Sequence, residues 1–289
     1  MSKSAVDPTP PAGPGSGAST GAPSGVGARA DAAAGPGLGE HRSRGVSWPR
    51  RFLANLLGWP TLVITTVACA SFVICCTWLL PRRWTHKVFI ALSRFWSRCW
   101  LWSSGMDWKF EGEAPAGGAV YVANHASWLD IPALILALPP TVRFAAKDSL
   151  FRIPLFGAAL RAGGFLPVNR EDRSRARDTF ASGREHLAEG GSVLFFPEGT
   201  RTYDGALLPF QRGAFLMALK SRLPVVPVGV EGSFRGLPRT SWSLVPTSIV
   251  VRIGEALEAE DYGLRERRRL VADAHAAVTE LAGLEAPPS

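Results

Sequence analysis

Residues 119–130 read AVYVANHASWLD, and the expected architecture follows from this segment. Its first part, Ala119–Ala123, is a short apolar run with alternate valines, which is typical of a buried β-strand. A polar loop follows, and the apolar segment Ile131–Leu138 then carries Pro132 in its first turn, where a helix tolerates proline. The stretch therefore predicts a strand, a loop and a helix, which together begin an α/β sheet.

The same alternation continues toward the end of the chain. Strand-like apolar runs recur at Val142–Ala146, Phe165–Val168, Ser192–Phe196, Val225–Val230 and Ile249–Ile253. Helix-like patterns recur at Pro154–Ala162, Arg173–Ala188 and Gly213–Ser221, and a terminal amphipathic helix is marked by Leu270, Ala274, Ala277, Val278 and Leu281. This alternation predicts an α/β domain over residues 110–289, with a mainly parallel sheet flanked by helices. Ligand sites in such sheets gather at the carboxyl ends of strands, so we expect chemistry in the loops after residues 123 and 196.

Residues 46–109 predict a membrane-anchoring segment. Phe52–Pro81 is 30 residues without a charge, and Thr61–Leu80 is a nearly continuous apolar run of 20. Roughly 20 apolar residues are needed for a helix to cross the hydrocarbon core. Basic residues flank both ends, so the positive-inside rule gives no orientation. A single spanning helix, two shorter pieces broken at Pro60, and a hairpin that dips into one leaflet all stay open.

The following stretch, Val88–Trp108, predicts an interfacial helix. Eight of the ten tryptophans fall between Trp48 and Trp108, and indole rings favour the depth of the lipid headgroups. Arg94 and Arg98 lie four residues apart among aromatic residues, so we expect their guanidinium groups to face lipid phosphates. An ordinary amphipathic helix packed on the α/β domain is the alternative.

Residues 1–45 form a low-complexity tail with 10 Gly and 6 Pro among many Ala and Ser. This composition buries too little apolar surface to offset its chain entropy, so we expect disorder. No apolar core directly follows a basic start, which argues against a secretory signal. Gly13 and Gly15 do not predict a phosphate-binding loop, because no strand-like segment precedes them and no helix-like segment follows.

The net charge of +8 and the isoelectric point near 9.8 call for an anionic partner, either nucleic acid or an acidic membrane surface. Residues 46–109 hold 8 Lys and Arg against one Asp, whereas residues 110–289 hold 20 of each sign. The excess therefore lies around the apolar segment, where anionic lipid headgroups would sit, and no motif supports a nucleic-acid partner. Four cysteines without a C-x-x-C pair exclude a zinc ribbon and a redox motif.

His125 and Asp130 are the candidate catalytic pair of the first loop. A turn from strand into helix can fold Asp130 back beside His125, and a carboxylate on one imidazole nitrogen leaves the other nitrogen to take a proton. This pattern is typical of a general base that deprotonates a hydroxyl group. The alternative is that Asp130 only caps the helix and His125 is a satisfied loop residue. Without G-x-S-x-G or H-E-x-x-H, neither a covalent serine relay nor a zinc protease is indicated.

The second loop reads FFPEGTR over residues 195–201. Gly199 lets the backbone approach a ligand closely, and Thr200 offers a hydroxyl. Arg201 offers a planar fork that suits phosphate oxygens. A simple turn after a strand would also explain these residues.

In this order and at this spacing, the motifs resemble the glycerolipid acyltransferase family, in particular its members that acylate 1-acyl-sn-glycerol-3-phosphate. The resemblance covers about residues 85–255. It rests on NHASWLD (124–130), AKDSLF (146–151), GGFLPVNR (163–170), FPEGTR (196–201), LPFQRGAF (208–215) and LPVVPV (223–228). The chain departs from the family at Gln211, which stands where Lys is frequent and removes one charge near the expected phosphate site, and at Pro167 inside the GGFLPVNR block.

This resemblance implies transfer of a fatty acyl group from a thioester, acyl-CoA or acyl-ACP, to the sn-2 hydroxyl of lysophosphatidic acid, giving phosphatidic acid. It implies that His125 deprotonates the hydroxyl and that Asp130 orients the imidazole, with no metal and no cofactor. The resemblance implies that the second loop binds the phosphate through Glu198, Gly199, Thr200 and Arg201. Two further candidates are Arg170 and Lys147, either of which could instead be an ordinary surface cation.

The resemblance also implies a membrane protein whose catalytic domain lies on the cytoplasmic side and whose partners are lysophosphatidic acid and anionic headgroups. Two alternatives stay open. One is an acyltransferase for another lysolipid, such as a lysophospholipid or a lyso-ornithine lipid. The other is a catalytically inactive lipid-binding protein, against which the intact His125 and Asp130 pair and the EGTR loop weigh.

Overall fold

The computed structural model describes residues 46–169 and 173–284, so the tail expected at residues 1–45 lies outside the described residues. The described chain begins with two long helices, α1 (Trp48–Leu79) and α2 (Arg82–Ser103). The strands are β1 (Asp107–Glu111), β2 (Val120–Ala123), β3 (Val142–Lys147), β4 (Leu166–Val168), β5 (Ser192–Phe195), β6 (Val225–Glu231) and β7 (Ser248–Ile253). The other helices are α3 (Asp130–Ala137), η1 (Asp148–Arg152), α4 (Phe156–Ala162), α5 (Arg173–Ala188), α6 (Gly213–Ser221), α7 (Ser233–Gly236), η2 (Ala259–Asp261) and α8 (Arg267–Leu281).

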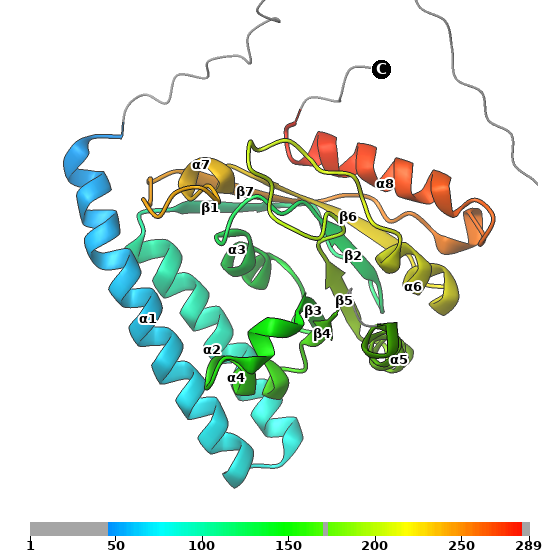
Figure 1. Cartoon of the computed structure of the whole chain (residues 1–289), viewed down its shortest axis with the longest axis horizontal. Coiled ribbons are helices and arrows are strands. Elements are labelled where there is room, and N and C mark those ends of the chain that lie inside the picture. The colour runs from blue at the N-terminus through cyan, green and yellow to red at the C-terminus, as the bar shows by residue number, and fades with distance from the viewer. Residues whose placement is uncertain (1–45, 170–172, 285–289) are drawn as a thin grey trace, which may run out of the picture. The chain divides into compact units, whose positions relative to one another are not determined.

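Within the described residues, the strands form a seven-stranded sheet in the order β1-β7-β6-β2-β5-β3-β4 (Figure 1). Neighbouring strands are parallel except β6 and β7, which run antiparallel. The expected α/β fold with a mainly parallel sheet is confirmed. Strand β1 differs from expectation, because residues 107–109 of Asp107–Glu111 lie in the segment assigned to the anchor. The chain thus enters the sheet before residue 110.

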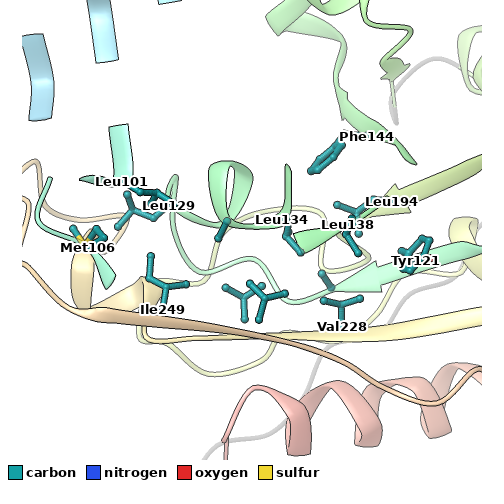
Figure 2. Close-up of a cluster of buried hydrophobic side chains, with 14 of the residues drawn as sticks. Leu101, Met106, Tyr121, Leu129, Leu134, Leu138, Phe144, Leu194, Val228 and Ile249 are labelled. Carbon is teal, nitrogen blue, oxygen red and sulfur yellow. The ribbon is translucent and has the colours of Figure 1, made fainter. Parts of the chain in front are cut away.

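Alternate residues of β2 point to opposite faces of the sheet, and all four are buried. Tyr121 and Ala123 belong to a core that α2 and α3 complete, and Figure 2 shows Tyr121 in this cluster with Leu134 of α3. Val120 and Val122 belong to a second core that α6 and α8 complete. Helices therefore cover both faces of the sheet, which explains why this strand is a continuous apolar run in the sequence (Figure 1).

Helices α1 and α2 lie side by side in a hairpin that turns at Leu80 and Pro81 (Figure 1). Trp96 Nε1 donates a hydrogen bond to Thr66 Oγ1 at 2.8 Å across the hairpin. Of the alternatives left open by the sequence, a break at Pro60 is absent, because α1 runs through this residue. A proline ring removes one backbone N–H donor, and here the flanking turns continue the helix on both sides.

Helix α1 is exposed along much of its length. This helix is long and apolar enough to cross a membrane, and only 17% of its most apolar 18-residue stretch is buried. One side is held to the α/β domain, where the Asn55 amide exchanges hydrogen bonds with the backbone of Leu244, both at 2.9 Å. The large apolar side chains that remain exposed on α1 are Trp48, Phe52, Leu53, Leu56, Leu57, Val63, Ile64, Val67, Phe72, Trp78 and Leu79.

Part of the tryptophan-rich segment, which was expected to lie at the lipid interface, packs on the α/β domain. Helix α2 ends at Ser103, before the chain turns into β1. Trp100 is buried in the core, and Arg94 Nη2 donates to the carbonyl of Leu138 at 3.1 Å. One N–H of this guanidinium group therefore caps the end of α3, whereas Arg98 is exposed. Other aromatic side chains of α2 stay exposed, namely Trp84, Phe95 and Trp102.

Candidate active site

The two loops singled out in the sequence meet because their strands are neighbours. Strands β2 and β5 pair in parallel with Val122 opposite Phe195, so their carboxyl ends lie at the same edge of the sheet. The first loop carries His125 and the second carries Phe196. Their rings stack with centroids 4.0 Å apart and an interplanar angle of 20°. The imidazole is thereby held against an apolar wall.

His125 and Asp130 form a hydrogen-bonded pair. His125 Nδ1 lies 2.8 Å from Oδ2 of the fully buried Asp130. The same oxygen accepts the backbone N–H groups of Ala126 and Ser127, each at 2.8 Å. Asp130 is the first residue of α3, where the helix dipole favours a negative charge. The N-cap position belongs to Leu129 and no side chain caps it, so Asp130 does not serve as the helix cap.

This arrangement sets the protonation pattern of the imidazole ring. A carboxylate can only accept, so Nδ1 carries the proton and Nε2 is left as the acceptor. The His125 side chain is 17% exposed, and among the described residues none forms a hydrogen bond with Nε2. The pair can therefore take a proton from a group that approaches from outside.

Glu198 holds the backbone of the loop that carries His125. Its Oε1 accepts the N–H of His125 at 2.5 Å, and its Oε2 accepts the N–H of Leu208 at 2.9 Å. Burial raises the pKa of Glu198 to about 7, although both N–H donors act in the opposite direction. The carboxylate was expected among the phosphate-binding residues. Both of its oxygens instead face backbone donors, and a carboxylate would also repel phosphate.

The rest of the second loop presents a hydroxyl and a guanidinium group. Gly199 has φ +82°, in the left-handed region that favours glycine. Thr200 is exposed, and the guanidinium carbon of Arg201 lies 4.3 Å from the ring centroid of Trp128 in the first loop. Burial lowers the pKa of Arg201, and the positive charge of Arg239 adds to this effect. Thr200 and Arg201 are thus brought to the same edge of the sheet as His125.

Two phosphate candidates remain. Lys147 is exposed at the carboxyl end of β3, and β5 lies between that strand and β2. Arg170 lies outside the described residues.

Ser127 is buried and its hydroxyl donates to the carbonyl of Leu237 at 2.8 Å, so it is committed to the fold. In the part of the chain that the structure describes, no group of three His, Cys, Asp or Glu side chains could hold a metal ion.

Arg239 belongs to this site although no motif in the sequence points to it. It follows β6 and α7, and its Nη1 donates to Thr200 Oγ1 at 2.7 Å and to the carbonyl of Arg201 at 2.8 Å. Its guanidinium carbon lies 4.1 Å from the ring centroid of Tyr203. The contact between Arg239 and Thr200 depends on how the chain folds back after α7. The two residues are 39 positions apart, and no spacing rule predicts such a contact.

Comparisons with known proteins agree with this geometry. A family model described as Acyltransferase matches residues 108–231. Over 177 residues the chain is 34% identical to the 1-acyl-sn-glycerol-3-phosphate acyltransferase of Salmonella typhimurium, covering 58% of this chain and 70% of that protein. Over 122 residues it is 43% identical to the chloroplastic 1-acyl-sn-glycerol-3-phosphate acyltransferase BAT2 of Brassica napus, covering 42% of this chain and 35% of that protein. The chain thus spans about a third of the plant relative and most of the bacterial one.

The fold has a solved counterpart. The crystal structure of the 1-acyl-sn-glycerophosphate (LPA) acyltransferase PlsC from Thermotoga maritima superposes with a TM-score of 0.69 and 25% sequence identity. The match covers 83% of this chain and 99% of that one. It therefore extends beyond the α/β domain into the helices that precede it.

Proposed function

This chain belongs to the acyltransferase family, and we propose that it moves a fatty acyl group from an acyl thioester to the sn-2 hydroxyl of lysophosphatidic acid, giving phosphatidic acid. The observation that carries the proposal is the 2.8 Å contact between His125 Nδ1 and Asp130 Oδ2, which leaves Nε2 available beside the cationic loop that ends at Arg201. The names of the relatives support the same activity.

In this mechanism the acceptor hydroxyl donates a hydrogen bond to Nε2 of His125. As the hydroxyl oxygen attacks the thioester carbonyl, its proton passes to Nε2, and the negative charge of Asp130 stabilises the imidazolium. The tetrahedral intermediate then collapses and the C–S bond breaks. The proton on Nε2 goes to the leaving thiolate, so the products are the ester and the free thiol of coenzyme A or acyl carrier protein.

The acceptor phosphate is proposed to lie against Thr200 and Arg201. A guanidinium group matches two phosphate oxygens in a planar fork, and a hydroxyl can donate to a third. Because Arg201 stacks on Trp128, which is three residues from His125, the phosphate would be held at a fixed distance from the base. That geometry suits a hydroxyl on the same glycerol backbone as the phosphate.

The protein is proposed to work at the membrane, with its catalytic domain on the cytoplasmic side, where acyl-CoA or acyl-ACP is available. The exposed apolar side chains of α1 and the exposed aromatic side chains of α2 support attachment to lipid. Because one side of α1 is held to the domain through Asn55, insertion of the hairpin into one leaflet is favoured over a single crossing.

The test uses the purified full chain in phospholipid vesicles, with lysophosphatidic acid and either oleoyl-CoA or oleoyl-ACP, and measures phosphatidic acid by mass spectrometry. His125→Ala should remove turnover and leave vesicle binding unchanged. Parallel reactions with lysophosphatidylethanolamine and a lyso-ornithine lipid decide between acceptors. Absence of product from every pair of donor and acceptor, together with retained vesicle binding, would favour a lipid-binding protein without catalysis.

A further inference from the structure

Arg201 and Arg239 are neighbours in the site, and neither has a carboxylate as an ion-pair partner among the described residues. Asp130 acts on Arg201 from a distance, and it is committed to His125. Each of the two guanidinium groups is stacked on an aromatic ring instead, Arg201 on Trp128 and Arg239 on Tyr203.

Two other arginines of the domain, Arg252 and Arg269, are paired with carboxylates. Arg252 lies between Glu111 and Glu231, with a 2.8 Å contact to each carboxylate. Arg269 pairs at 3.0 Å with Glu266, the residue before α8, and also stacks on Tyr262. Two neighbouring cations that repel one another and lack such carboxylates are therefore a feature of the site, and binding of an anion would relieve the repulsion.

The two residues before Arg239 are bound to the first loop, and the Arg239 side chain is bound to the second loop. Pro238 pairs with Ser127 in an isolated antiparallel bridge, and the Leu237 carbonyl accepts the Ser127 hydroxyl. Arg239 uses Nη1 for Thr200 and the Arg201 carbonyl, which leaves Nη2 and Nε as donors. The segment that precedes it thus sets this second fork relative to His125.

We propose that Arg239 is the second cation of the acceptor site and determines its selectivity for a phosphomonoester over a phosphodiester headgroup. This inference rests on the proposed function. A monoester phosphate carries up to two negative charges near neutral pH, because its second pKa is about 6, and it has three terminal oxygens to share between two forks. A diester carries one charge and two terminal oxygens, so it gains less from a second guanidinium group.

The test compares lysophosphatidic acid with lysophosphatidylglycerol as acceptors for the full chain and for Arg239→Gln and Arg239→Lys. Arg239→Gln should lower kcat/KM for the monoester about 10- to 100-fold, chiefly through KM, as expected for loss of a charge-assisted hydrogen bond. The value for the diester should change by less than about threefold. Arg239→Lys should recover part of the monoester rate, because it restores the charge without the fork.

Arg235→Gln is the matched control, since Arg235 is four residues away, exposed, and paired loosely with Glu231 at 4.0 Å. It should leave both acceptors unaffected. If Arg239→Gln lowers kcat/KM equally for monoester and diester, Arg239 only holds the Thr200–Arg201 loop and the inference is overturned.

A binding measurement keeps this outcome separate from failure of the proposed function. In a His125→Ala background, calorimetry with short-chain lysophosphatidic acid and lysophosphatidylglycerol reports headgroup selectivity without turnover. An inactive parent chain that still binds the monoester preferentially, with the preference lost in the Arg239→Gln double variant, would refute the activity and uphold the selectivity. If the parent chain is active and the Arg239→Gln variant still prefers the monoester, the activity is upheld and the role of Arg239 in selectivity is refuted.

Discussion

Glu198 Oε1 accepts the backbone N–H of His125 at 2.5 Å, so the loop after β5 holds the base that follows β2. The other oxygen of the same carboxylate accepts the N–H of Leu208. Both contacts join segments that are separated along the chain, and both are made by a side chain that is only 5% exposed. Glu198 is therefore a positioning residue, whose protonation state is coupled to the stability of the site.

We expect Glu198 to make the fold less stable as the pH rises. Its folded pKa is raised from 4.5 to about 7, so in that window the folded chain keeps a proton that the unfolded chain releases. The free energy of unfolding should then fall by on the order of 3 kcal/mol between these pH values and level off above them. Glu198→Gln should remove this contribution.

The measurement is Tm in detergent from about pH 5 to pH 8 for both proteins. Burial lowers the pKa of His186 and His275, and all histidines are the same in both proteins, so the difference between the two curves isolates Glu198. Parallel curves would show that burial does not govern this carboxyl group.

Asp130→Asn should lower kcat about 10²- to 10⁴-fold with little change in KM. The amide oxygen can still accept the three N–H groups that converge on Oδ2, so the loop should keep its conformation. What is lost is the negative charge that stabilises the imidazolium. Initial rates at saturating donor, with Tm as the folding control, check this, and a kcat close to that of the parent would remove the charge from the mechanism.

The sequence predicted the strands that are buried on both faces, because helices on either side make them continuous apolar runs, as in β2 and β6. Strand β1 was missed because Asp107–Glu111 alternates polar and aromatic residues at the sheet edge and follows a tryptophan-rich helix. The His125 and Asp130 contact followed from a strand–loop–helix turn. The contacts of Glu198 and Arg239 depend on tertiary folding of distant segments, which motif spacing does not encode.

Trp128→Ala should raise KM for lysophosphatidic acid several-fold and leave kcat nearly unchanged. The indole ring lies under the Arg201 guanidinium group at 4.3 Å, and a contact of this kind contributes about 0.5–2 kcal/mol. Trp128→Phe keeps a ring and should recover most of the affinity. Steady-state kinetics with varied acceptor check this, and an unchanged KM in Trp128→Ala would separate Arg201 from acceptor binding.

Replacing Val63, Ile64 and Val67 together by Ser should weaken binding to vesicles of phosphatidylglycerol and phosphatidylethanolamine. These side chains are 51–65% exposed on α1, and each loses apolar area that a leaflet would bury. Co-sedimentation with vesicles measures the effect. Leu264→Ser is the control, because Leu264 is similarly exposed at 58% but lies just before α8. Equal partitioning of both variants and the parent would argue against membrane attachment through this face.

Asn55→Ala should destabilise the protein and also weaken acceptor binding. It leaves the N–H and C=O of the buried Leu244 without their partners, which should cost on the order of 2–4 kcal/mol. Asn55→Asp is the matched variant and should cost more, because its second carboxylate oxygen can only accept and would face the carbonyls of Arg51 and Leu244, to which the amide nitrogen donates at 2.8 and 2.9 Å. Tm measures the first effect.

Acceptor KM measures the second effect. Leu244 lies in the segment that begins at Leu237 and carries Arg239, so release of this segment from α1 should move Arg239 away from Thr200 and raise the KM for lysophosphatidic acid. The two effects should follow the same order, with Asn55→Ala between the parent and Asn55→Asp. A lowered Tm with an unchanged KM would mean that α1 stabilises the domain without setting the acceptor site.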